Sequence, residues 1–156
     1  MKFNRYLSMS IIFLGLVALT LGVVFVTEGI MKNNLIVNRM KIENVTLTID
    51  EVVTEINNAA EAQAAADIIA SHRRGIAPTY QDLLLTFNTN EGRFDPNNTT
   101  HLTYAQAMNL ENYLYMAVTA FGLIQVTEAA GLFMVITGLA LGGGGLVLFR
   151  KSRAPA

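Results

Sequence analysis

The stretch YLSMSIIFLGLVALTLGVVFVT, residues 6–27, contains no Asp, Glu, Lys, Arg or His. A second stretch, AAGLFMVITGLALGGGGLVLF at residues 129–149, has the same property. A helix needs about 20 apolar residues to cross a hydrocarbon core of about 30 Å, and a charge near mid-bilayer would cost several kcal/mol. The sequence therefore predicts a mainly α membrane fold with two transmembrane helices, residues 6–27 and 129–149.

The charges are sorted around these two segments. All twelve acidic residues lie between them, together with six of the eleven basic residues, so residues 28–128 carry a net charge of −6. The other five basic residues give the short ends a charge of +5. Because basic flanks stay in the cytoplasm, we expect cytoplasmic tails at 1–5 and 150–156. The two spans then form a hairpin in a membrane, with residues 28–128 as a small, mostly helical extracytoplasmic domain.

A cleaved signal peptide is the alternative for the first segment, because residues 1–5 resemble its basic n-region. The apolar run is too long for an h-region, however, and no small-x-small cleavage signal precedes Glu28. We therefore expect an uncleaved anchor. The chain has no cysteine, so an external domain of this small size holds together by packing, by the membrane or by partners.

The first half of the external region contains three predicted elements. The first span continues as a helix through residues 28–39, and residues 42–49 alternate like a half-buried strand, with 84–87 as the only weak candidate for a partner. Residues 58–74 predict an Ala-rich helix. Asn58 and Glu61 match a capping box, and Gly75 is expected to supply a left-handed cap.

The second half begins with a short helix at 79–85 capped by Thr79, followed by turn-forming residues at 88–100. Thr103, with Gln106, is expected to begin a helix that has no clear stop before Phe149. Such a helix exceeds the membrane thickness. It either rises above the membrane under a protein cover or breaks near residues 130–131, and a third, re-entrant span at 112–127 is the alternative.

Small residues line one face of each predicted span. They are Gly15, Ala18 and Gly22 in the first, and Gly131, Gly138, Gly142 and Gly145 in the second. Small residues at such spacings allow helix backbones to approach closely in lipid. The stripes are interpreted either as contacts with other proteins or as packing between the protein's own two helices.

Five further residues are candidates for an external interaction: His72, Arg73, Arg74, Glu28 and Glu128. Glu28 and Glu128 each follow a Val-Thr pair at the outer end of a span, so they could share a proton, bind a cation, or pair with Arg39 or Arg73. The simpler interpretation is two ordinary interfacial glutamates. His72, Arg73 and Arg74 fill the last turn of their predicted helix, where cations oppose the helix dipole.

The sequence offers little for catalysis. A facial iron site needs two histidines and a carboxylate, and the chain has only His72 and His101. His72 is explained by the helix end, and His101 lies in a polar turn where exposed histidines are ordinary. A Gly-x-Ser-x-Gly elbow and a phosphate-binding loop are also missing. We therefore expect no catalytic residue, metal ligand, cofactor or nucleic-acid partner.

The run Ala64-Ala65-Ala66-Asp67-Ile68-Ile69-Ala70-Ser71-His72, followed by Thr79-Tyr80-Gln81-Asp82-Leu83, resembles a bacterial family of small two-span membrane proteins. That family shows a "QADII…H" segment, then "TYAEL", an Asp-Pro and an Ala-Phe-Gly, matched here by Ala120-Phe121-Gly122. Arg73-Arg74-Gly75 and a longer Asn-rich insertion depart from its pattern. Its members are often labelled aromatic ring-opening dioxygenases, although their role is not established. The resemblance implies the two-span architecture and a location in a bacterial plasma membrane, and it implies no activity.

These features favour a non-catalytic membrane protein, either an accessory subunit of a larger membrane complex or a homo-oligomer. The expected partners are the lipid bilayer and other membrane subunits or copies of the chain. One alternative is a small metal-binding membrane enzyme that uses His72 and His101. The other is a transporter or channel component, which is disfavoured because neither span has an ionisable residue at its centre.

Overall fold

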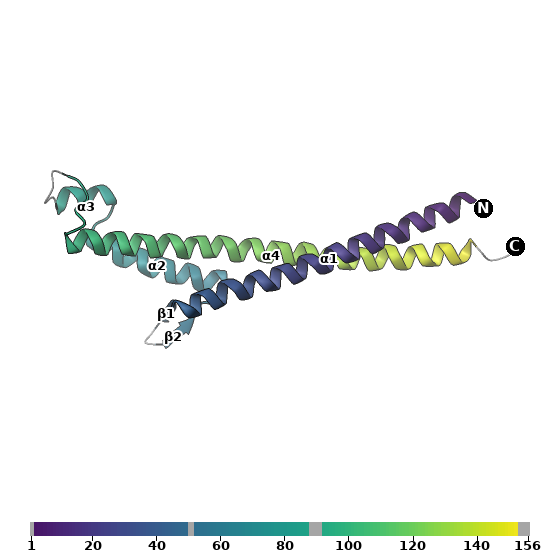
Figure 1. The fold of residues 1–156 in the computed structure, drawn as a ribbon, viewed down its shortest axis with the longest axis horizontal. Coiled ribbons are helices and arrows are strands. Elements are labelled where there is room, and N and C mark those ends of the chain that lie inside the picture. The colour runs from purple at the N-terminus through teal and green to yellow at the C-terminus, as the bar shows by residue number, and fades with distance from the viewer. Residues whose placement is uncertain (1, 50–51, 88–91, 153–156) are drawn as a thin grey trace. The chain divides into compact units, whose positions relative to one another are not determined.

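The computed structural model describes residues 2–49, 52–87 and 92–152, and it is mainly helical. The elements in order are α1 (Lys2–Ile42), β1 (Thr46–Ile49), β2 (Val52–Glu55), α2 (Ala59–Ile76), α3 (Tyr80–Thr86) and α4 (Thr99–Lys151), as Figure 1 shows. By length and composition, α1 and α4 are long and apolar enough to cross a membrane. The expectation of a mainly helical chain with two long apolar helices is confirmed.

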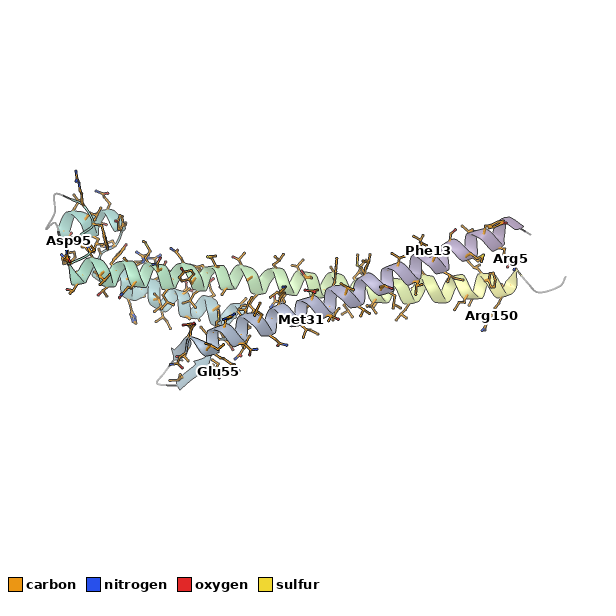
Figure 2. All side chains as sticks on the ribbon, in the orientation of Figure 1. Arg5, Phe13, Met31, Glu55, Asp95 and Arg150 are labelled. Carbon is orange, nitrogen blue, oxygen red and sulfur yellow. The ribbon has the colours of Figure 1, made fainter. Side chains whose placement is uncertain are left out.

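The chain divides into two compact units. The helix-pair unit comprises Met1–Asn34 and Leu123–Ala156, and the central unit comprises Leu35–Gly122. In the helix-pair unit α1 and α4 run antiparallel, since the guanidinium of Arg5 lies 5.7 Å from the ring centre of Phe149 while Gly29 contacts Glu128. Figure 2 shows Arg5 and Arg150 at the same end of this unit.

Most large apolar side chains of the helix-pair unit point away from the partner helix. In the most apolar window of each long helix, only 11% of the residues are buried. Phe13, labelled in Figure 2, is 64% exposed, and Phe133 is 71% exposed. A core helix of a soluble protein would instead be mostly buried.

The second long helix is continuous but begins earlier than predicted. It starts at Thr99, so the prediction of a start at Thr103 with a Gln106 capping box is wrong. The side chain of Asn98 accepts the amide of Thr100 at 2.9 Å and that of His101 at 3.4 Å. This cap satisfies the first exposed amides and leaves Thr103 inside the helix. The helix does not break at residues 130–131.

The Ala-rich helix is present as α2, but its C-terminus differs from the prediction. Asn58 caps its start by accepting the amide of Glu61 at 3.0 Å. The carboxylate of Glu61 accepts from the amide of Asn57, at 2.7 Å, to complete the cap. The prediction that Gly75 forms a left-handed cap is wrong, because α2 continues to Ile76 and ends at the extended Ala77. Pro78 explains this end, since the residue before a proline is excluded from helical conformations.

The predicted strand is present as β1, but its partner is β2 rather than residues 84–87. The two strands are antiparallel, with Thr46 opposite Glu55, and Lys41 forms an ion pair with Glu55 at 2.8 Å. A short connection makes this local pairing entropically cheaper than one with a distant segment. Residues 84–86 are unavailable because they lie in α3. Thr79 caps this helix, as the sequence predicted, and Asp82 completes a capping box.

The core of the central unit lies among α1, α2, α4 and the start of the hairpin. Its buried residues are Ile56, Ala62, Ala65, Ala66, Leu114, Ala117 and Phe121. The small alanines of α2 allow it to lie close along α4, as Figure 1 shows. A second, smaller cluster of Ala77, Leu83 and Tyr104 packs α3 against the start of α4. In the predicted turn region 88–100, residues 92–98 are non-helical, and 88–91 lie outside the described residues.

Candidate functional site

The contact surface of the helix-pair unit is built from small residues spaced by seven. Among residues 5–34, the buried positions of α1 are Ser8, Gly15, Gly22 and Gly29, and Gly131, Gly138 and Gly145 are buried on α4. A seven-residue repeat keeps one seam facing the partner helix when the two helices wind around each other with a left-handed supercoil. Small residues at the seam let the backbones touch, which is the way helices associate in lipid.

Two glycine pairs show how close this approach is. A Cβ atom added to Gly15 would lie 2.9 Å from the carbonyl oxygen of Gly138, and one added to Gly138 would lie 2.7 Å from that of Gly15. Gly22 and Gly131 are related in the same way, with distances of 2.6 and 2.9 Å. Any larger side chain at these positions would therefore overlap with backbone atoms of the opposite helix, and no side-chain rotation could relieve the overlap.

The structure divides the small residues named from the sequence into two groups. Gly15, Gly22, Gly131, Gly138 and Gly145 contact the opposite helix of the same chain, which is the intramolecular interpretation. The amide nitrogen of Gly142 lies beside Gly15, yet a Cβ on Gly142 itself would meet nothing within 4 Å. Ala18 is only half-buried. Sequence reasoning missed Ser8 and Gly29, although the spacing of seven from Gly15 and Gly22 was a usable signal.

Glu28 and Glu128 lie in different environments. Glu28 is exposed on α1, whereas Glu128 is half-buried. The side chain of Glu128 lies over Gly29, where an added Cβ would be 2.4 Å from its Cγ. Gly29 therefore provides the room that lets a carboxylate side chain lie at the seam.

The main polar cluster of the central unit joins α2 to α4. Arg73 donates from Nε to Glu111 at 2.6 Å and from a terminal nitrogen to the hydroxyl of Tyr104, and its guanidinium lies 5.0 Å from the Tyr104 ring centre. The Arg73 and Glu111 side chains are only 12% and 10% exposed. The hydrogen bond to Glu111 raises the pKa of Arg73 above its ordinary value. Because Arg73 and Glu111 pair with each other, the cluster holds α2 against α4.

Arg73 therefore pairs with Glu111, and not with Glu28 or Glu128 as one interpretation of the sequence suggested. Arg74 and His72 are exposed on α2. Asp67, five residues before His72 on α2, accepts a hydrogen bond from the hydroxyl of Tyr115 at 2.9 Å, which raises the pKa of Tyr115. This second bond also joins α2 to α4.

The two histidines occupy different environments and come from different helices. His101 is fully buried, so the expectation of an exposed histidine is wrong. Its Nδ1 accepts the amide of Asp95 at 3.0 Å, and its ring stacks on Phe94 with 5.5 Å between the centres. Within the described part of the chain, no group of three or more His, Asp or Glu side chains is placed to hold a metal ion. The placement of these two histidines therefore gives no support to the metal-binding alternative.

An apolar groove lies on the surface of the central unit. Its larger hollow has a volume of about 420 Å³, and a smaller one of about 160 Å³ shares Val45, Leu110 and Leu114 with it. His72 lines the larger hollow, and Arg39 and Glu43 line the smaller one. On α4, which also carries Leu110 and Leu114, Tyr113 and Met116 are 66% and 65% exposed. Tyr113 also lines the smaller hollow, so exposed apolar side chains of α4 lie beside the groove.

Comparisons of the chain with known protein families, with curated proteins and with solved structures found no match.

Proposed function

We propose that the protein spans a membrane twice, through residues 6–27 and 129–149, with both termini in the cytoplasm and residues 28–128 outside. The observation that carries this proposal is the 11% burial of the most apolar windows of α1 and α4. Helices that contact each other only along a glycine seam leave their large apolar side chains uncovered, and hydrocarbon is the solvent that suits them. The +5 charge of the two ends supports the orientation.

The cysteine-free chain permits a direct test of this topology. Ser71 is exposed on α2, and Ser152 lies just after α4. We expect a membrane-impermeant maleimide to label a Ser71→Cys variant in intact cells, and to label a Ser152→Cys variant only after permeabilisation. Labelling of Ser152→Cys in intact cells, or release of the protein by an alkaline carbonate wash, would contradict the proposal.

Within that topology, we infer a non-catalytic role as an accessory subunit of a larger membrane complex. Tyr113 and Met116 precede the second proposed span by more than three helical turns, so lipid does not cover them. Exposed apolar patches that lipid does not cover are typical of protein interfaces. The groove beside them offers a partner an apolar surface with Arg39 and Glu43 at its edge.

Native mass spectrometry after gentle detergent extraction tests this role. We expect the protein to be recovered with a partner subunit, and we expect Met116→Lys to remove that partner by placing a charge at the contact. Asn112→Lys adds the same charge at an exposed polar position of the same helix and should leave the assembly intact. Recovery of wild-type protein only as a monomer would refute the assembly role, and recovery only with copies of itself would establish a homo-oligomer instead.

A further inference from the structure

A pocket with both polar and apolar walls lies between the start of α1 and the end of α4. Leu7 and Ser8 line it from α1, and Leu148, Lys151 and Ser152 line it from the end of α4. Its volume of about 380 Å³ falls in the range of about 300–1,000 Å³ found for small-molecule sites. Two leucines provide an apolar wall, and one cation with two hydroxyl-bearing residues provides a polar one. This combination suits an amphiphilic ligand.

The net positive charge around the pocket favours the binding of an anion. Residues 1–27 and 129–156 contain no Asp or Glu, although five basic residues lie there. Lys151 forms no ion pair with any described residue. Arg5, whose guanidinium lies over Phe149, and Arg150 add positive charge at the same end of the unit, as Figure 2 shows. No acidic side chain of these residues balances the positive charge at this end of the unit.

We propose that this pocket binds one anionic phospholipid of the cytoplasmic leaflet. The ammonium of Lys151 pairs with the lipid phosphate, and an acyl chain lies against Leu7 and Leu148. The inference rests on the proposed topology, which places this end at the leaflet that carries anionic lipid. Basic pockets between membrane helices on this side are known to hold such headgroups. Arg150, one residue earlier, shares the helix-end position but does not line the pocket.

The experiment uses the full chain in nanodiscs of phosphatidylcholine with a minor share of phosphatidylglycerol. Native mass spectrometry after release into detergent counts the lipids retained per protein. We expect one phosphatidylglycerol to be retained in preference to phosphatidylcholine. Lys151→Gln should lower that retention about fivefold, the effect of one lysine near an anionic surface. Lys151→Arg should preserve retention, and the matched control Arg150→Gln should change it less than twofold.

Each of the following outcomes would overturn the proposal. Equal retention of the two lipids would show that headgroup charge has no role. Equal losses in Lys151→Gln and Arg150→Gln would indicate attraction to the whole basic surface instead of a site. Displacement of the lipid by millimolar inorganic phosphate would identify a free-anion site. Failure of the chain to insert into nanodiscs would contradict the proposed topology, whereas insertion without retained lipid would refute the lipid site alone.

Discussion

Replacing Gly22 by alanine tests whether backbone contact between α1 and α4 holds the helix-pair unit together. The added Cβ would lie 2.6 Å from the carbonyl oxygen of Gly131 and 2.7 Å from the amide nitrogen of Val135. Contacts below 3.0 Å are essentially never observed for real Cβ atoms. Because both neighbours are backbone atoms, no side-chain rotation relieves the overlap. The two helices must move apart along this part of the seam.

The expected cost follows from the contacts that are lost. Overpacking a close-packed interface costs about 1–3 kcal/mol, and lipid offers no hydrophobic gain that would draw the helices together again. We therefore expect Gly22→Ala to destabilise the pair by about 2 kcal/mol. Gly29→Ala should cost less, because its neighbour is the flexible side chain of Glu128. Gly143→Ala, which meets nothing within 4 Å, should stay within about 0.5 kcal/mol of wild type.

Unfolding by SDS in mixed micelles measures these differences. Dyes on cysteines introduced at Arg5 and Arg150, which lie at the same end of the unit, report separation of the helices by loss of energy transfer. A double variant of Gly22→Ala and Gly131→Ala should cost less than the sum of the two single changes, because one separation relieves both overlaps. Equal midpoints for Gly22→Ala and Gly143→Ala would show that close backbone contact at Gly22 does not hold the two helices together.

Three further predictions concern the central unit. Gly75→Ala should stabilise α2 by about 0.5 kcal/mol, because Gly75 is an exposed helical residue with open space around it. Slower hydrogen exchange in α2 would show this stabilisation, whereas faster exchange would indicate that Gly75 forms a left-handed cap. Arg73→Met should destabilise the chain by about 3 kcal/mol by leaving the Glu111 carboxylate unpaired, and adding Glu111→Leu should recover most of the loss in a thermal melt. The hydrogen bond to Asp67 raises the pKa of Tyr115 above 10.0. The contribution of this bond to folding stability is therefore complete below pH 10 and is lost as pH rises through the pKa of Tyr115 in the folded chain. Tyr115→Phe should remove this contribution to the loss of stability at alkaline pH.

Local signals in the sequence predicted local structure well. Asn58 and Thr79 cap their helices as expected, because a cap depends on a few adjacent residues. Predictions failed where two local signals competed. Gly75 and Pro78 both end helices, and Pro78 decided the end of α2. Asn98 and Thr103 both favour a helix start, and the earlier cap was used.

Contacts between distant residues were harder to predict. The pairing of Arg73 with Glu111 joins positions 38 residues apart, and no spacing rule connects residues on two separate helices. The burial of His101 depends in the same way on Asp95 and Phe94 folding back over it. The glycine spacings predicted a close-packed helix face, but only the structure shows that the opposite face belongs to the same chain.

The buried positions of α4 mark where its surroundings change. Ala117, Ile124, Gly131, Gly138 and Gly145 are all buried and follow one another at intervals of seven. In the central unit the buried face of α4 carries Ala117 together with Leu114 and Phe121, which fill space between helices as in a soluble core. From Gly131 onward glycine replaces them, backbone meets backbone, and no room remains for large side chains at the seam. Those side chains must face outward, and Leu132, Phe133 and Ile136 are 57%, 71% and 58% exposed. The change from large to small buried residues between Ile124 and Gly131 therefore agrees, independently of charge, with the proposal that the following part of α4 crosses a membrane.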